Sequence, residues 1–280
     1  ALRGITKQYK DFTLGPVDMT VPAGSIVGLI GENGAGKTTL LKILCGVNRA
    51  DDGTVDLLGG SPADAATRAK IGVVFEDAFF YGSFTAAQVA RSLAGMYGAR
   101  WNADSFSAYL RRFGLDAGKK LKEYSRGMRL KLSLAAALAH DPELLVLDEA
   151  TAGLDPVVRG ELLDLFLEFI QDERHSIVMS SHITADLEQI ADSIAYLHNG
   201  QLLFQENKDD LLQEYGVLHC GEDVLTSLPA GLVVFTRRGA YGCESLVRER
   251  RTVQELLPEA VCDAARLDDI MRFYSGRDAQ

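Results

Sequence analysis

The sequence predicts an α/β protein built around a mostly parallel sheet. Short apolar runs bounded by glycine alternate with longer segments of helical periodicity, a pattern typical of strands and helices that alternate along the chain. Composition agrees, because 47% apolar and 24% charged residues lie in the ordinary globular range and exclude a disordered chain. With 280 residues, the chain is long enough to bury a core without crosslinks.

Two hairpins and a series of buried strands are expected. The first hairpin is antiparallel and covers residues 5–21, where apolar positions alternate around a turn. The second is turned by Asn199-Gly200, a dipeptide that suits a two-residue connection between residues 193–197 and 202–205. The apolar runs that predict buried strands between these hairpins are residues 25–30, 54–58, 71–75, 143–147 and 176–180.

Helices are predicted where apolar residues recur at helical spacing between the strands. One start is marked by Asp155-Pro156, since Asp can cap a first turn and Pro suits the first helical position. The predicted helices are residues 38–45, 155–168 and 184–190, together with a stretch from 85 to about 139 that breaks near 98–102, 114–119 and 124–126.

The character of the chain changes beyond about residue 207. Short strands are expected there over residues 217–220, 231–236 and 244–249, followed by a closing helix over 268–274. We therefore expect two parts. They are a first domain over residues 1–206, with a helical subdomain at about 77–139, and a small α+β appendage over residues 207–280.

Charge, cysteines and hydropathy exclude several classes of protein. The net charge is −10, the wrong sign for a protein that neutralises nucleic-acid phosphates, so no nucleic-acid partner is expected. The four cysteines lie far apart without a Cys-x-x-Cys pair, which argues against a zinc ribbon or a secreted disulfide scaffold. No window approaches the roughly 20 apolar residues that cross a bilayer, and no secretory signal is evident. A cytoplasmic protein is expected.

A phosphate-binding loop is predicted over residues 31–38, which fit G-x-x-x-x-G-K-[ST] between an expected strand and an expected helix. Glycines let the backbone amides curl around a β-phosphate, and Lys37 can bridge the β- and γ-phosphates of ATP. The Thr38 hydroxyl can ligate Mg²⁺. The residues expected to bind the nucleotide here are Gly31, Asn33, Gly34, Ala35, Gly36, Lys37, Thr38 and Thr39.

Two adjacent carboxylates end the predicted strand at residues 143–147. Asp148 lies where the sheet edge can present it to Mg²⁺, and Glu149 can take a proton from an attacking water. An Asp-Glu pair at a strand end is otherwise a solvated helix start. The phosphate loop favours the metal and catalytic roles.

By motif order, residues 1–205 resemble the nucleotide-binding domain of ABC transporters. The deciding segment, Tyr-Ser-Arg-Gly-Met-Arg at residues 124–129, stands where that family carries Leu-Ser-Gly-Gly-Gln. Ser125 and Gly127 match the positions that contact the γ-phosphate held by the opposite subunit, whereas Arg126 and Met128 depart from the family pattern. The resemblance implies a P-loop NTPase core with an N-terminal antiparallel β-subdomain and a helical insertion between the phosphate loop and Asp148.

Four further residues take roles by the same resemblance. Asp155 closes a D-loop that contacts nucleotide at the dimer interface, and His182 is the switch histidine near the γ-phosphate. Tyr9 matches the aromatic residue that stacks on adenine, although it also fits a partly buried hairpin residue. Glu76 stands where the family usually has a metal-contacting Gln, and its charge would alter Mg²⁺ binding or slow hydrolysis.

The resemblance implies an ATP-hydrolysing subunit of a multisubunit ABC transporter, most like the ABC-2 type exporters. Such a subunit forms a homodimer, or a heterodimer with another ABC ATPase subunit, around two ATP molecules. It drives separate permease subunits from the inner face of the cell membrane. Four aromatic residues would either receive the permease or pack between the helical insertion and the core: Phe79, Phe80, Tyr81 and Phe84.

Other classes of ATPase remain as alternatives. A DNA-repair or chromosome ABC ATPase expects a long coiled coil, yet Lys37 and Asp148 are only 148 − 37 = 111 residues apart without sustained heptads. A translation-associated ABC protein usually carries two motif sets, and a plain P-loop kinase lacks the Ser125 segment.

Overall fold

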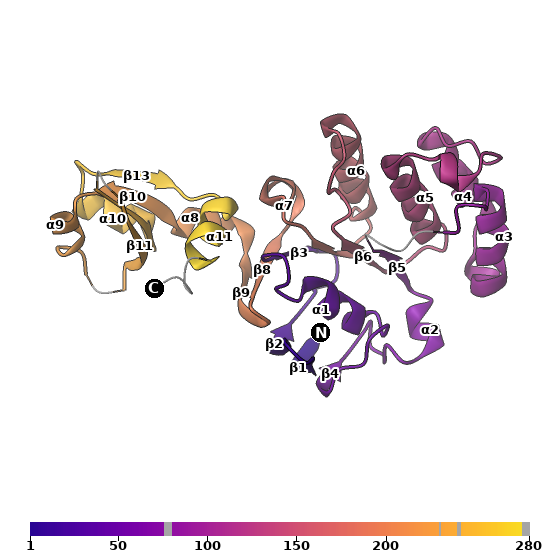
Figure 1. Ribbon diagram of the computed structural model, residues 1–280, viewed down its shortest axis with the longest axis horizontal. Coiled ribbons are helices and arrows are strands. Elements are labelled where there is room, and N and C mark those ends of the chain that lie inside the picture. The colour runs from indigo at the N-terminus through magenta and orange to yellow at the C-terminus, as the bar shows by residue number, and fades with distance from the viewer. Residues whose placement is uncertain (76–79, 230, 240–241, 276–280) are drawn as a thin grey trace.

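The computed structural model describes residues 1–75, 80–229, 231–239 and 242–275. Its centre is a six-stranded sheet in the order β5-β6-β7-β3-β8-β9 (Figure 1). The bounds of these strands are β5 (Ile71–Val74), β6 (Leu144–Asp148), β7 (Ser176–Ser180), β3 (Ile26–Ile30), β8 (Ser193–His198) and β9 (Gln201–Asn207). The strands from β5 to β8 run parallel, and β9 pairs antiparallel with β8. The expected mostly parallel sheet is confirmed.

The middle strands of this sheet are buried on both faces, which explains their continuous apolar runs. Side chains alternate between two cores along β3, where Val27 and Leu29 pack on one face and Ile26 and Ile30 on the other. The first core contains α1 (Lys37–Leu44), and the second contains α6 (Pro156–Phe169) and α7 (Thr184–Ile190). Layers on both faces leave the strand ends as the place for polar side chains.

A second, three-stranded antiparallel sheet covers the face that carries α1. It has the order β2-β1-β4, formed by β1 (Leu2–Gln8), β2 (Thr13–Met19) and β4 (Asp52–Val55). The predicted strand over residues 54–58 was wrong at its end, because Leu57 and Gly60 exchange backbone hydrogen bonds of 2.8 and 2.9 Å that close a turn. A short helix that was not predicted, α2 (Ala65–Arg68), follows this turn.

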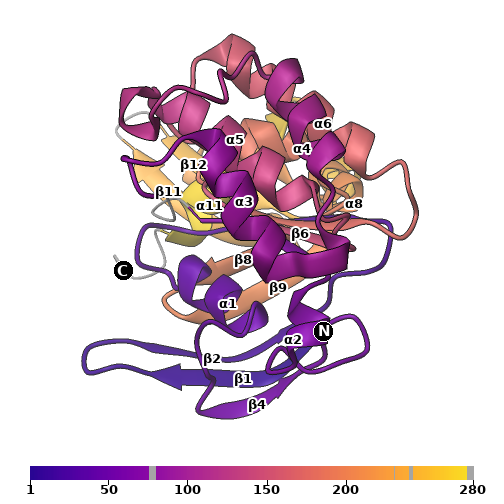
Figure 2. The ribbon, with the colours of Figure 1, turned by 90° about the vertical axis from the view of Figure 1, so that its right-hand side faces the viewer.

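The helical segment is broken where the sequence predicts, and it forms an arm beside the sheet that shares the core of the sheet through Leu134, Ala137 and Leu138 (Figure 2). Its elements are α3 (Ala86–Tyr97), η1 (Gly98–Arg100), α4 (Ala103–Arg112), η2 (Leu121–Glu123) and α5 (Arg126–Leu138). Thr85 and Gln88 form a reciprocal capping box at the start of α3, and Ser125 caps α5. Within the described ranges, no helix combines the length and apolar character that crossing a bilayer requires.

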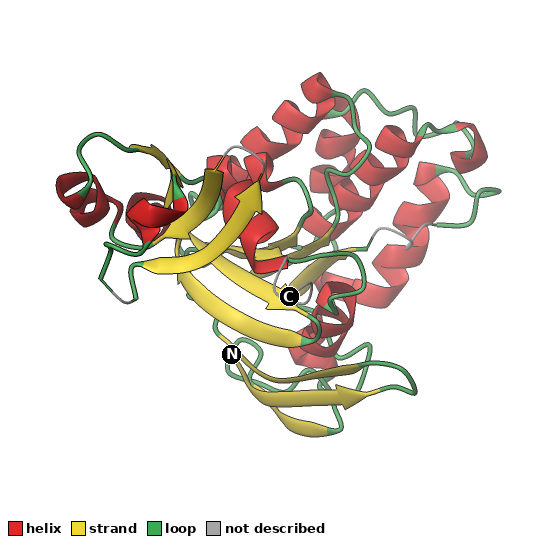
Figure 3. Cartoon of the chain, turned by 60° about the vertical axis from the view of Figure 1, so that its left-hand side comes forward, coloured by secondary structure: helices red, strands yellow, loops and turns green. Residues whose placement is uncertain are grey.

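The C-terminal part is built on a four-stranded antiparallel sheet in the order β11-β12-β10-β13, seen beside the central sheet in Figure 3. Its strands are β10 (Gly216–Cys220), β11 (Val233–Gly239), β12 (Gly242–Val247) and β13 (Val261–Ala264). Its helices are α8 (Lys208–Glu214), α9 (Glu222–Leu225), α10 (Arg250–Leu256) and α11 (Leu267–Ser275). The sequence reading missed α8, α9, α10 and β13, all of which are short.

This C-terminal part shares a hydrophobic core with the central sheet. The ring of Tyr274 on α11 meets the rings of Tyr196 and Phe204 edge-on, at centroid distances of 5.7 and 5.6 Å. A hydrogen bond from the Leu267 backbone amide to Glu188 Oε1 on α7, 2.8 Å long, adds a polar link. Because these contacts join residues far apart in the chain, we infer that α11 stabilises the central sheet.

We expect Tyr274→Ala to lower the free energy of unfolding by about 3 kcal/mol, because it empties a buried aromatic site. Tyr274→Phe keeps the ring and loses only the 3.2 Å hydroxyl contact with Tyr215, so its loss should be about 1 kcal/mol. Urea unfolding of the two variants measures both values, with exposed Met96→Ala as a neutral control. Equal stability of Tyr274→Ala and the parent would contradict the shared core.

Candidate active site

The phosphate loop, residues 31–38, joins β3 to α1, and glycines give its backbone conformations that other residues rarely adopt. Gly34 and Gly36 adopt left-handed φ values of 83° and 106°. A Cβ at Gly31 would lie 2.2 Å from the Leu197 carbonyl oxygen, whereas one at Gly34 would meet nothing within 4 Å. Helix α1 begins at Lys37, and the preceding residue Gly36 provides no side-chain cap, so the first amides of the helix have no side-chain acceptor. This cradle fits a phosphate group.

The ammonium group of Lys37 is held at the mouth of this loop. The residue is only 6% exposed, and Nζ donates to the carbonyl oxygens of Gly31 and Glu32 at 2.7 and 3.2 Å. Nζ also lies 3.5 Å from Glu149 Oε1. A buried cation between carbonyl oxygens and a carboxylate can exchange these contacts for phosphate oxygens.

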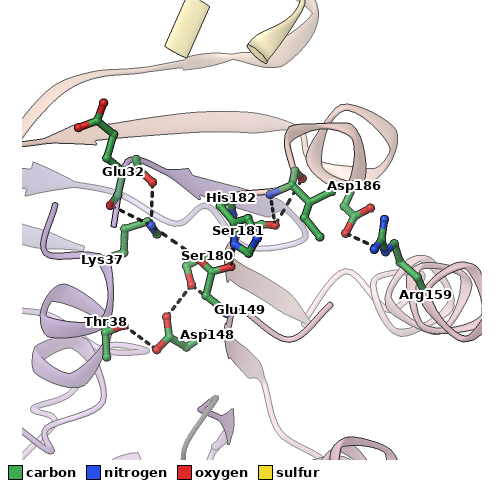
Figure 4. A network of polar contacts seen from close by, with 12 residues as sticks. Glu32, Lys37, Thr38, Asp148, Glu149, Arg159, Ser180, Ser181, His182 and Asp186 are labelled. Atoms are coloured by element: carbon green, nitrogen blue, oxygen red, sulfur yellow. Dashed lines mark hydrogen bonds and ion pairs between the residues drawn. The ribbon is translucent and has the colours of Figure 1, made fainter. Parts of the chain in front are cut away.

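Asp148 connects three segments of the chain at the end of β6 (Figure 4). Its Oδ2 accepts from Thr38 Oγ1 at 2.8 Å, and its Oδ1 accepts from Ser180 Oγ at 2.6 Å. These oxygen donors are the ligand type that Mg²⁺ prefers, so the residues fit the expected metal. Burial and then the charge of Asp148 raise the pKa of the nearby Cys45 thiol to about 12, so this thiol stays neutral.

Glu149 is fixed by its backbone as well as by its side chain. It has a left-handed φ of 52°, a strained conformation that the surroundings must hold. Its amide donates to the carbonyl oxygen and to the hydroxyl of Ser180, both at 3.1 Å. Its Oε2 accepts from the His182 amide at 3.2 Å and lies 2.6 Å from His182 Nδ1. The carboxylate is therefore oriented between Lys37 and His182.

Ser180 is a residue of this network that the sequence reading missed. It occupies the last position of β7 and is fully buried, and it contacts both carboxylate residues. The available signal was a polar residue at the end of an otherwise apolar strand beside the predicted switch histidine.

Tyr9 lies in the turn between β1 and β2 and is 43% exposed. Its ring is 6.5 Å from that of Phe12, whose side chain in turn contacts the position that a Cβ on Gly36 would take. An exposed ring close to the phosphate loop is available to a base. Stacking on adenine stays a prediction.

The Ser125 segment lies away from the phosphate loop in the single chain. Figures 1 and 2 both show α5 in the helical arm, apart from α1. Ser125 is exposed, and its hydroxyl accepts from the Met128 amide at 3.2 Å. Asp155 likewise serves as the cap of α6, with Oδ1 accepting from the Val158 amide at 3.0 Å. Neither hydroxyl nor carboxylate completes the site of its own chain.

The described aromatic residues after β5 differ in burial. Phe80 and Phe84 pack against the core of the helical arm. Tyr81 is 78% exposed, with its ring 5.7 Å from that of Phe84. Glu76 and Phe79 lie outside the described residues, so their expected roles stay predictions.

Comparison with known proteins agrees with this arrangement. Residues 14–152 match the family described as ABC transporter. An uncharacterized ABC transporter ATP-binding protein of Synechocystis is 38% identical over 206 residues, which cover 71% of this chain and 58% of that protein. The bacitracin transport ATP-binding protein BcrA of Enterococcus faecalis is 36% identical over 212 residues, 74% of this chain and 68% of that protein. The chain thus spans less than two thirds of the Synechocystis relative.

Solved structures are similar over about three quarters of the chain. An ATP-binding subunit of an ABC transporter superposes with a TM-score of 0.68 at 29% identity, covering 75% of this chain and 90% of that chain. A dimeric post-hydrolysis state of the ATP-binding cassette MJ0796, bound to ADP and Pi, gives a TM-score of 0.67 at 23% identity, covering 74% and 97%. The likeness to MJ0796 shows the fold alone.

We expect Ser180→Ala to lower ATP turnover at least about ten-fold, because it removes the hydroxyl that Asp148 binds and one of the two acceptors of the Glu149 amide. Ser176→Ala is the matched control, since the hydroxyl of this buried serine at the other end of β7 donates to the Pro22 carbonyl oxygen and, among the described residues, has no other partner. Its turnover should equal that of the parent. Steady-state phosphate release measures both, and equal losses in the two variants would contradict a specific role for Ser180.

Proposed function

Because this chain belongs to the ABC transporter family, we propose that it is the ATP-hydrolysing subunit of a multisubunit transporter, acting as a dimer on separate permease subunits. The observation that carries the proposal is the convergence of Lys37, Asp148 and Glu149 at one edge of the central sheet. The cradle of the phosphate loop opens at the same edge. These groups suit a triphosphate.

Each side chain at this edge has a separate task. The phosphate-loop amides and Lys37 bind the β- and γ-phosphates of ATP. Thr38 and Asp148 would hold Mg²⁺, which when bound neutralises charge on the phosphate oxygens. Glu149 orients an attacking water and takes its proton, while His182 holds the carboxylate of Glu149 in place.

A second copy supplies what one chain lacks. Ser125 and Gly127 lie in the helical arm, whereas the space beside Gly34 is open. Two chains arranged head to tail would bring each Ser125 segment onto the ATP of the other, as a closed two-fold dimer permits. We favour a homodimer for this chain, with a heterodimer of ABC subunits as the other form. ATP then joins the two copies, and hydrolysis releases them.

We propose that the permease receives the movement of the two copies as they join and separate. Its contact with the permease would hold the subunit at the inner face of the cell membrane. BcrA is named for bacitracin transport, and export is the direction that we favour for this chain. The exposed ring of Tyr81 offers an aromatic anchor for a permease segment. No described feature favours a nucleic-acid function, and the net charge of −10 opposes it.

Glu149→Gln should trap the dimer, because it keeps the shape of the side chain and removes the base. We expect light scattering to give twice the monomer mass with Mg-ATP and the monomer mass with Mg-ADP. Adding Lys37→Ala to this variant should abolish the ATP effect, since the cradle loses its cation. A monomer at saturating Mg-ATP would count against homodimer closure.

We expect Tyr81→Asp to leave the basal ATPase rate within about two-fold, because an exposed side chain contributes little to folding. The same variant should no longer co-purify with the permease, since a charge replaces the aromatic anchor. Met96→Asp, at another exposed position of the helical arm, serves as the control and should still co-purify. Retained assembly by Tyr81→Asp would place the permease contact elsewhere.

A further inference from the structure

An ion pair joins α6 and α7, the helices that follow the ends of β6 and β7. Arg159 on α6 points toward Asp186 on α7, and the two are drawn side by side in Figure 4. Asp186 is only 3% exposed. A carboxylate buried to this extent requires a partner, and Arg159 is the cation within ion-pair distance among the described residues.

The contact between these two side chains is incomplete. Arg159 Nε lies 4.0 Å from Asp186 Oδ2, and neither atom has a hydrogen-bond partner among the described residues. Ordinary N–H···O bonds are about 2.9 Å long, so an approach of roughly 1 Å would satisfy both atoms. Two buried, unpaired atoms that face one another are costly, and a small closing movement would remove the cost.

Arg159 also reaches back to the loop that precedes its helix. Its Nη2 donates to the Leu154 carbonyl oxygen at 3.3 Å. The loop over residues 150–155 begins directly after Glu149, and α7 begins two residues after His182. The segment that contains Glu149 and the loop is therefore connected at two places to the segment that contains His182 and α7. Glu149 and His182 touch at one end, and Arg159 joins the loop to α7 at the other.

We propose that Arg159 is a positioning residue for ATP hydrolysis, which acts with Asp186 to fix the loop against α7 and thereby sets the geometry of the Glu149–His182 pair. Arg159 lies on α6, outside the phosphate loop and the strand ends. Its planar group can bond the Leu154 carbonyl oxygen and the Asp186 carboxylate together, which a lysine ammonium on a flexible stem does poorly. The catalytic part of this inference rests on the proposed function.

Arg159→Lys and Asp186→Asn test the proposal in the full chain. We expect the kcat for ATP hydrolysis to fall about ten-fold or more, with the KM for ATP within about two-fold, because geometry and not binding is affected. In a chain that already carries His182→Ala, Arg159→Lys should lower kcat almost no further, since both changes disrupt the same set of contacts. Arg174→Met, which removes an exposed Arg174–Asp172 pair, is the control and should keep the parent kcat.

A second measurement does not depend on turnover. The NMR signals of the His182 imidazole should shift in Arg159→Lys and stay in place in Arg174→Met. If the parent chain hydrolyses no ATP, the proposed function fails, and these signals still decide whether Arg159 positions His182. The inference is overturned if the imidazole signals are unchanged, if kcat stays within about two-fold of the parent, or if the loss adds fully to that of His182→Ala. A fall in thermal stability alone would show a structural role.

Discussion

The carboxylate of Asp148 constrains three segments of the chain at once. Its two oxygens accept from Thr38 at the start of α1 and from Ser180 at the end of β7, at 2.8 and 2.6 Å. Charge-assisted bonds of this length fix position strongly in a buried setting. Because Ser180 Oγ also accepts from the Glu149 amide, one hydroxyl contacts both of the adjacent carboxylate residues. Disturbing this contact would move the phosphate loop, β6 and β7 relative to one another.

The layered fold explains why such a network lies where it does. Strands buried on both faces admit polar side chains only at their ends, and parallel strands present their carboxyl ends at one edge. Here the ends of β3, β6 and β7 bring the phosphate loop, the two carboxylates and His182 together. Helix α5 of the helical arm lies apart from α1, and the Ser125 hydroxyl at its start is exposed, so the chain carries a nucleotide cradle and a separate hydroxyl that another copy can use.

Much of the core fold could be predicted, because its strands are continuous apolar runs and apolar residues recur at helical spacing between them. The predicted strand over residues 176–180 and the helix over 184–190 coincide with β7 and α7. The order of strands in the sheet could not be predicted, since it depends on contacts between distant segments. The short elements of the C-terminal part were missed for a related reason. Helix α10, for example, buries only Val253 and so carries almost no apolar periodicity.

The candidate site, too, could be predicted from the sequence only where a local motif marks its residues. Lys37, Thr38 and the two adjacent carboxylates stand in a recognisable motif order, and the structure brings them together. Ser180 and Arg159 act through contacts that span the chain, and no local pattern marks either of them.

The most direct measurement is a crystal structure of the Glu149→Gln variant with Mg-ATP. In the proposed dimer, each γ-phosphate lies between the phosphate loop of one copy and the Ser125 hydroxyl of the other, at hydrogen-bond distance. Two copies that bind ATP with both Ser125 hydroxyls facing solvent would contradict it.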